Sequence, residues 1–123
     1  AELIAVPTNW PLGDRPVGER APEVTIAMAA ARVNRVFIAC CDRTGTERGQ
    51  EWTGGTSIID ESGWVLASQS QLGSAHAVVD LTRAHDKSLT RLADVLGDRR
   101  PELYGALAAG VASDTDSAGS SAG

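Results

Sequence analysis

In the first part of the chain, the pattern of apolar and polar residues predicts a strand, a long loop and a helix. Residues 3–6 form a continuous apolar run ended by Pro7, which is the pattern of a strand buried on both faces. Residues 11–22 contain prolines and glycines at intervals that allow neither a helix nor a strand to continue, so they predict a loop. The alanine-rich stretch from Glu23 to about residue 34 follows directly after a proline and predicts a helix.

The middle of the chain carries the pattern of further strands. Residues 36–41 are apolar and predict a second buried strand, followed by a polar turn over residues 42–51. Residues 54–60 and 64–67 flank the short polar sequence Glu-Ser-Gly, which predicts two strands joined by a tight turn. This is the clearest hairpin signal in the sequence.

The periodicity weakens toward the C-terminal end. Residues 75–83 alternate loosely between apolar and polar positions and predict another strand. The leucines and alanine of residues 88–96 have the spacing of a short amphipathic helix. Residues from about 109 to 123 are almost entirely Ala, Gly, Ser and Asp, a composition that predicts a disordered tail because it buries too little apolar surface.

The order of these elements indicates an α+β architecture with a mostly antiparallel sheet and flanking helices. A strand as apolar as residues 3–6 normally lies inside a sheet, yet only two residues precede it. We therefore expect the chain to be part of a larger domain.

Composition and charge exclude several classes of protein. Hydrophobic residues make up 42% of the 123 positions and charged residues 22%, as in ordinary globular chains, and no apolar run is long enough to span a bilayer. The net charge of −5 argues against a nucleic-acid partner, because phosphate binding requires clustered Lys and Arg. No secretion signal is recognisable, and we expect a cytoplasmic protein.

Four segments and their order resemble a known family. They are residues 1–10, which end in Pro-Thr-Asn-Trp, residues 34–39, residues 52–63, which contain Gly-Gly-Thr-Ser-Ile-Ile-Asp-Glu-Ser-Gly, and residues 77–81. Together they resemble the C-terminal half of the carbon–nitrogen hydrolases of the nitrilase/amidase superfamily, and residues 99–104 are similar to that family's closing motif. The expected domain comprises residues 1–108.

The sequence departs from the family pattern at a few positions. Val33 stands where the family usually has a glutamate, and Asp42 stands in place of a frequent asparagine. Thr56 and Glu61 replace a serine and a proline. None of these departures changes the expected fold.

The resemblance implies that the chain forms half of a four-layer αββα sandwich. The complete family member would hydrolyse non-peptide C–N bonds in amides, carbamoyl compounds or nitriles. In that reaction a Cys thiolate attacks the carbon, a Glu carboxylate moves protons and a Lys ammonium stabilises developing negative charge. This chemistry needs no metal ion or cofactor.

The resemblance also implies that the three catalytic residues lie upstream of the matched segments. The family's cysteine would precede Ala1, and the single lysine of this chain, Lys87, falls after the predicted strand at residues 75–83. We therefore expect no catalytic residue in the chain and no activity from it alone.

The two cysteines and two histidines allow two other interpretations. Cys40 and Cys41 are adjacent on a predicted strand, so their side chains point to opposite faces and cannot easily form a disulfide. Either could act as a nucleophile with His76 or His85, but a buried structural cysteine fits the apolar surroundings better. A metal site made of these four residues is disfavoured, because typical zinc ligand pairs have a gap between the cysteines.

Asn9 and Trp10 are the candidate substrate contacts. They follow the C-terminal end of a predicted strand and open the long loop, where the resemblance implies contact with a small amide, carbamoyl or nitrile substrate. The alternative is a turn-forming asparagine beside a packed tryptophan.

Other conspicuous side chains receive structural interpretations. Trp52 and Trp64 flank the Gly-rich strand and are expected in packing contacts, and Asp80 is expected to be structural or solvated. The cluster of Arg99, Arg100 and Tyr104 is either an ordinary solvated surface or an anchor on a partner subunit.

Three hypotheses for function remain open at this point. The first is that the chain is a partial carbon–nitrogen hydrolase, either truncated or split. The second is that it is a non-catalytic interaction module, whose partner is a second copy or the missing N-terminal half. The third is that it is a self-sufficient thiol enzyme. Without the missing half the apolar strand at residues 3–6 is incompletely covered, so we expect self-association or marginal stability.

Overall fold

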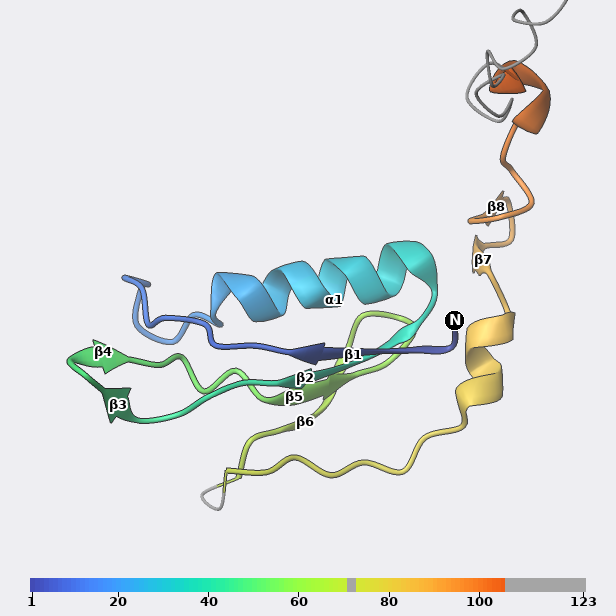
Figure 1. The fold of residues 1–123 in the computed structure, drawn as a ribbon. Helices are drawn as coiled ribbons and strands as arrows, with labels where there is room; N and C mark the ends of the chain where they lie inside the picture. Colours follow the sequence, from blue (N-terminus) through green and yellow to red (C-terminus); the bar gives the residue numbers. More distant parts are fainter. Residues whose placement is uncertain (71–72, 106–123) are drawn as a thin grey trace, which may run out of the picture.

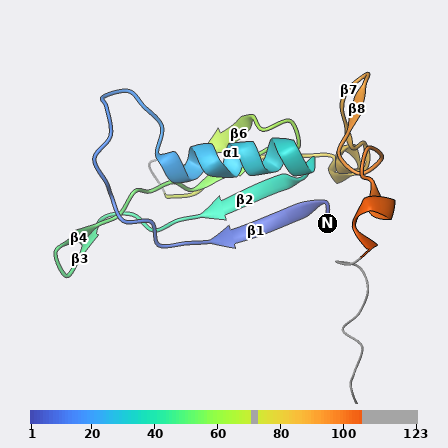
Figure 2. The same ribbon diagram turned by 90° about the horizontal axis from the view of Figure 1, so that it is seen from above.

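A four-stranded sheet with one helix packed on it forms the body of the protein. The structure is a computed structural model that describes residues 1–70 and 73–105. The strands are β1 (Leu3–Pro7), β2 (Phe37–Cys41), β5 (Ser57–Ile59) and β6 (Val65–Ser68), and they lie in the order β1-β2-β5-β6. β1 and β2 are parallel, whereas β2 pairs with β5, and β5 with β6, in antiparallel fashion (Figures 1 and 2). The predicted α+β class with a mostly antiparallel sheet is confirmed.

Helix α1 (Pro22–Asn34) covers one face of this sheet. It begins with Pro22, where the missing N–H costs nothing, and ends at Arg35, which adopts the left-handed conformation with φ 50°. Its inward positions are small or β-branched residues (Val24, Ala27 and Ala31), which allow a close approach to the strands. The expected helix is confirmed, with the loop of residues 11–22 before it.

The core lies between α1 and the sheet. Alternate strand residues point toward the helix, so Ile38, Cys40 and Ile59 form a buried cluster with Ala27, Ala31 and Val36. Val6 and Trp10 pack against the same cluster and are only partly buried. The helix side of the sheet therefore holds the main hydrophobic cluster, while Phe37 and Ala84, each 1% exposed, are buried outside it.

Residues 3–6 are not buried on both faces among the described residues, in line with the expected incomplete coverage of this strand. β1 is the edge strand of the sheet, and Leu3 and Ile4 are 43% and 41% exposed. The opposite face of the sheet carries no helix or sheet layer among the described residues 1–70 and 73–105, although Phe37 is 1% exposed and Ile58 lies beside residues 75–78. An apolar groove of about 440 Å³ runs there, lined by parts of β1, β2 and β5 and by residues 73–75.

The hairpin predicted at residues 54–67 and the polar turn predicted after β2 are both confirmed. The hairpin of β5 and β6 forms around the turn at residues 60–63, with an irregular register between Ile58 and Ile59. The polar turn after β2 contains a small two-stranded ribbon of β3 (Thr46–Glu47) and β4 (Gln50–Glu51), which projects from one end of the body (Figure 1).

The strand predicted at residues 75–83 does not form. Residues 75–80 have no regular structure, and η1, a 3-10 helix (Leu81–His85), follows them. A strand requires a hydrogen-bonded neighbour, whereas this segment runs below the sheet on the side away from α1 (Figure 1). Asp80, for which a structural or solvated role was predicted, caps η1. Its carboxylate accepts from the hydroxyl of Thr82 at 2.7 Å and from the backbone N–H of Thr82 at 3.0 Å, and these two hydrogen bonds lower the pKa of the carboxyl group.

The helix predicted at residues 88–96 is also wrong. The segment contains two short paired strands, β7 (Ser88–Thr90) and β8 (Ala93–Asp94), and a second 3-10 helix, η2 (Pro101–Leu103), comes after it. The Thr90 hydroxyl and the Asp94 carboxylate accept from backbone N–H groups two residues further on, at 3.2 and 2.9 Å. These local hydrogen bonds favour turns over helix. The predicted disordered tail lies outside the described residues.

Candidate functional site

The best-defined polar cluster lies where the parallel strands β1 and β2 end. The chain leaves β1 at Pro7 and β2 at Cys41, and the carboxyl ends of parallel strands meet at the same edge of a sheet. The sequence Thr8–Pro11 therefore lies beside Asp42 and beside the Gly-rich stretch before β5. The backbone links these segments directly, because the N–H of Thr8 donates to the carbonyl of Cys41 at 2.9 Å and that of Thr53 to the carbonyl of Trp10 at 2.9 Å.

Asp42 is the centre of this cluster. Its side chain is buried, with the residue 9% exposed. One carboxylate oxygen accepts from the hydroxyl of Thr8 at 3.1 Å and from the backbone N–H of Trp10 at 2.9 Å. The other accepts from the N–H of Gly55 at 2.8 Å. Asp42 thus joins the ends of β1 and β2 to the start of β5.

The two predicted substrate contacts have different environments. Asn9 is exposed, whereas Trp10 is partly buried and packs against the core cluster. The ring of Trp10 lies so close to Gly55 that a Cβ there would come within 2.9 Å of two ring carbons. Trp10 therefore packs against Gly55 and the core, whereas Asn9 is exposed at the surface.

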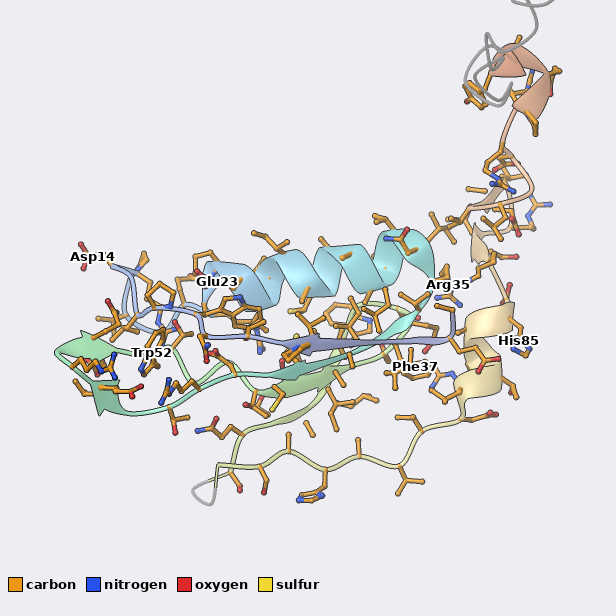
Figure 3. The ribbon with its side chains drawn as sticks, viewed as in Figure 1. Asp14, Glu23, Arg35, Phe37, Trp52 and His85 are labelled. Atoms are coloured by element: carbon orange, nitrogen blue, oxygen red, sulfur yellow. The ribbon has the colours of Figure 1, made fainter. Side chains whose placement is uncertain are left out.

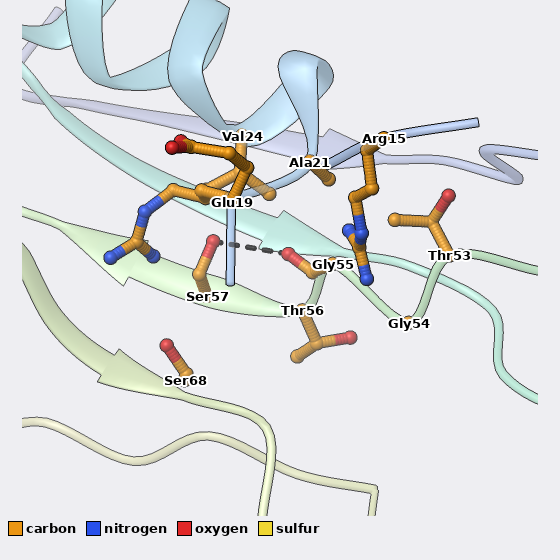
Figure 4. Close-up of a pocket in the computed structure, with 11 residues that line it drawn as sticks. Arg15, Glu19, Ala21, Val24, Thr53, Gly54, Gly55, Thr56, Ser57 and Ser68 are labelled. Atoms are coloured by element: carbon orange, nitrogen blue, oxygen red, sulfur yellow. Dashed lines mark hydrogen bonds between the residues drawn. The ribbon is translucent and has the colours of Figure 1, made fainter. Parts of the chain in front are cut away.

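A pocket of about 190 Å³ opens beside this cluster (Figure 4). It lies between the start of α1 and the strands β5 and β6, with Arg15 and Arg20 from the long loop at its rim. Ser57 on its wall is 2% exposed and donates its hydroxyl hydrogen bond to the carbonyl of Gly55 at 3.1 Å. Arg15, Ser57 and Asp42 were not predicted as residues of a site, although a charged residue directly after a buried strand is a usable signal for Asp42.

The cysteines differ as their positions on β2 require. Cys40 is buried and Cys41 is exposed, and both are free thiols. The pKa of the Cys40 thiol is raised by burial, which outweighs the lowering effect of a side-chain hydrogen bond with Ser57, and the nearby Asp42 carboxylate raises it further. Among the described residues, no three His, Cys, Asp or Glu side chains gather where they could bind a metal ion.

Lys87 and the histidines do not lie at the Asp42 cluster. The ammonium of Lys87 donates to the carbonyls of Asn34 and Arg35 at 3.1 and 2.7 Å, so it caps the C-terminal end of α1. His85 pairs with Glu2 at the same end of the body, opposite Trp52 (Figure 3). The side chain of His76 is exposed.

The remaining aromatic and basic candidates lie mostly at the surface. Trp52 is partly buried beneath the guanidinium of Arg43, which lies 5.5 Å from the ring centre, whereas Trp64 is 66% exposed beside α1. Arg99, Arg100 and Tyr104 are exposed. None of the helices in the described ranges is long and apolar enough to cross a membrane.

Comparison with known proteins identifies the fold and a sequence relative. The chain is 32% identical over 108 residues to a nitrilase from Pyrococcus abyssi, and the match covers 85% of this chain and 37% of the relative. No family model matches the chain. The chain therefore spans little more than a third of the curated relative it matches.

Solved structures agree with this assignment. A carbon–nitrogen hydrolase from Helicobacter pylori superposes with a TM-score of 0.61 at 23% identity, covering 87% of this chain and 41% of that one. An amidase variant from Nesterenkonia sp., whose active-site cysteine carries the acetamide moiety of fluoroacetamide, superposes with a TM-score of 0.54 at 26% identity, covering 87% and 35%. In sequence and in fold, the chain matches a part of the carbon–nitrogen hydrolases of the nitrilase/amidase superfamily.

Proposed function

We propose that this chain is the C-terminal portion of a carbon–nitrogen hydrolase. The complete protein would hydrolyse amides, carbamoyl compounds or nitriles through a Glu, a Lys and a Cys that lie outside these residues. The observation that carries the proposal is the similarity to a nitrilase over 108 residues, supported by the partial match to hydrolase structures. The expected domain is residues 1–108, and its setting is the cytoplasm, where free thiols such as Cys40 and Cys41 persist.

The chemistry of the described residues supports the assignment of catalysis to another part of the protein. The reaction requires a thiolate, a carboxylate and an ammonium group around one carbon atom. The thiol of Cys40 is buried with a raised pKa, and the ammonium of Lys87 is engaged at the end of α1. We therefore propose that the chain alone is inactive.

The part of the chain that would contact substrate is the loop after β1. Asn9 is exposed at the carboxyl end of the strand, and Trp10 holds the loop against Gly55. We propose Asn9 as a direct contact and Trp10 as the wall behind it.

A second candidate function is that of an interaction module completed by a partner chain. The observation that favours it is the open side of the sheet, where exposed Ala5 and Cys41 line the apolar groove and Leu3 is also exposed on β1. Such a face is covered in a stable globular protein. The partner would be the missing half of the hydrolase or a second copy of this chain.

An ammonia-release assay tests the proposal. The 123-residue chain and the longest natural polypeptide that contains it are each incubated with acetamide, an N-carbamoyl amino acid and propionitrile. Ammonia release is expected from the longer polypeptide, or from the chain together with a co-purified partner that supplies Glu, Lys and Cys, and not from the chain alone. Turnover by the chain alone that disappears in Cys41→Ser would establish a self-sufficient thiol enzyme instead. A longer polypeptide without any C–N hydrolysis would contradict the proposed activity.

A further inference from the structure

The buried carboxylate of Asp42 is compensated entirely by neutral hydrogen-bond donors. Its three partners are the hydroxyl of Thr8 and the backbone N–H groups of Trp10 and Gly55, at 3.1, 2.9 and 2.8 Å. No cationic side chain within the described ranges forms a salt bridge with it. Several such hydrogen bonds stabilise a buried carboxylate. Removing the carboxylate would leave the buried donors without an acceptor, which costs free energy.

The backbone of Asp42 fixes the direction of this side chain. Its N–H donates to the hydroxyl oxygen of Thr56 at 3.0 Å, and the Thr56 hydroxyl donates to the carbonyl of Asp42 at 3.1 Å. Asp42 is therefore anchored to the start of β5 through main-chain atoms. Its carboxylate can reach across to the loop after β1 without moving.

The arrangement requires an acceptor at both side-chain oxygen positions. Oδ1 serves Thr8 and Trp10, whereas Oδ2 serves Gly55. Asparagine, the frequent residue at this position in the family that the chain resembles, has nearly the same shape, but its NH₂ group donates and cannot accept. The three donors around Asp42 therefore suit the carboxylate of this chain and not an amide. In either orientation of the amide, its NH₂ group would face one of the N–H or O–H donors around Asp42, and that donor would lose its acceptor.

We propose that Asp42 is the positioning residue of the candidate site, and that its two-sided acceptor character sets the Asn9–Trp10 loop against Gly55. The two links from Thr53, to the carbonyls of Trp10 and Pro11 at 2.9 and 3.0 Å, hold the far side of the loop. Asp42 supplies the link to β2. The statement that this loop meets substrate rests on the proposed function, whereas the positioning itself does not.

Amide hydrogen exchange in the full chain tests the positioning. In Asp42→Asn, either the Gly55 amide or the Trp10 amide is expected to exchange about tenfold faster, because one of the two loses its acceptor. In Asp42→Ala both are expected to accelerate. The amides of the β2–β5 ladder should keep their rates. Asp14→Asn removes the same charge from an exposed loop position and should change neither amide.

The hydroxyl of Thr8 provides a second, milder test. Thr8→Val is expected to accelerate exchange at Trp10, and Thr8→Ser should restore the wild-type rate because it returns the donor. Unchanged protection of both Trp10 and Gly55 in Asp42→Asn would overturn the proposal. An equal loss of protection throughout β2 and β5 would overturn it too, because Asp42 would then serve only global stability.

A kinetic experiment separates positioning from the proposed function. In the longer polypeptide, Asp42→Asn is expected to raise KM for a small amide about tenfold while kcat changes less than about twofold, because the loop contacts substrate and not the reacting groups. An unchanged KM beside accelerated exchange would overturn the substrate contact alone. If the longer polypeptide hydrolyses no C–N bond, the proposed function fails, and the exchange rates still decide the role of Asp42.

Discussion

In the candidate site the ring of Trp10 packs against the backbone of Gly55. The ring lies over the glycine, and Val24 of α1 approaches the same position, so that a Cβ on Gly55 would lie 2.9 Å from the ring and 3.0 Å from Val24. These distances are shorter than ordinary van der Waals contacts. Only a glycine at position 55, which has no side chain, leaves room for the loop after β1 to pack in this way.

Gly55→Ala is therefore expected to destabilise the fold by about 1–3 kcal/mol through overpacking. Urea unfolding followed by tryptophan emission measures the change. Gly13→Ala is the matched control, because a Cβ there meets nothing within 4 Å, and it should leave the free energy of unfolding nearly unchanged. Equal effects of the two substitutions would contradict the contact between Trp10 and Gly55.

Cys40 and Cys41 show how one position along a strand changes the chemistry of a side chain. Cys40 faces α1, where burial raises the pKa of its thiol, and Cys41 faces the open groove. Since the folded-state pKa of Cys40 is raised, its neutral thiol supports the fold below the unfolded-state pKa. That support is lost as the pH rises through the folded-state pKa.

A thiol reagent such as Ellman's reagent should therefore react rapidly with a single cysteine of the native protein and with both after unfolding. Cys41→Ser is expected to abolish the rapid phase, whereas Cys40→Ser should leave it intact. Rapid reaction of the Cys41→Ser protein would show that Cys40 is accessible and would reopen its role as a nucleophile.

At the scale of elements, a buried carboxylate joins three parts of the chain. Glu61, in the turn between β5 and β6, is 2% exposed and accepts from the guanidinium of Arg83 in η1 at 2.7 Å. Arg35, at the end of α1, donates to the backbone carbonyl of Glu61 at 3.2 Å and lies 3.9 Å from its carboxylate. The position of η1 therefore depends on compensating one buried charge.

Arg83→Met is expected to destabilise the protein by about 1–3 kcal/mol, because the Glu61 carboxylate would keep only the Ser62 hydroxyl and the more distant Arg35. Added to Glu61→Gln, the same substitution should cost less, with a coupling energy of about 1 kcal/mol in a double-mutant cycle. Thermal or urea unfolding gives these values. Arg91→Met, at an exposed position, is the control. Strict additivity would indicate that the two side chains do not interact in solution.

At the scale of the whole molecule, one face of the sheet is covered and the other is open. α1 covers the side that carries Ile38, Cys40 and Ile59, whereas Ala5 and Cys41 line the apolar groove on the other side and Leu3 is exposed on β1. β1 also presents an unpaired edge. Exposed apolar edges and faces promote association with another chain.

The isolated chain is therefore expected to self-associate as its concentration rises, and Leu3→Lys should reduce the association by placing a charge on the open side. Sedimentation equilibrium measures the average mass. Ile26→Lys introduces the same charge on the outer face of α1, where Ile26 is 68% exposed, and should leave the association unchanged. The reverse outcome would assign the contact to the helix, and a monodisperse monomer with a sharp, high melting transition would contradict incomplete coverage.

Several elements could be predicted from the sequence because their signals are local. The proline before α1, the apolar run of β2 and the Asp-Glu-Ser-Gly turn each act over a few neighbouring residues. Residues 75–83 and 88–96 were predicted wrongly for a common reason. Their patterns are weak, and the outcome depended on a missing strand partner in one case and on side-chain hydrogen bonds from Thr90 and Asp94 in the other.

The position of Asn9 and Trp10 at the end of a strand could be predicted, but the contacts around them could not. The sequence placed Asn9 and Trp10 at the end of a strand, and only the structure showed that Trp10 packs on Gly55 while Asp42 binds both sides. Asp42 and Gly55 are 13 residues apart, and Thr8 and Asp42 are 34 apart. No local pattern specifies such pairings.

The sequence by itself determined the helix, the buried second strand, the hairpin and the resemblance to carbon–nitrogen hydrolases, because these follow from periodicity, turn chemistry and short motifs. Tertiary structure alone decided that β1 lies at an edge and that Asp42 gathers its three donors. Burial and hydrogen bonding depend on which distant segments meet, and that is a property of the folded chain.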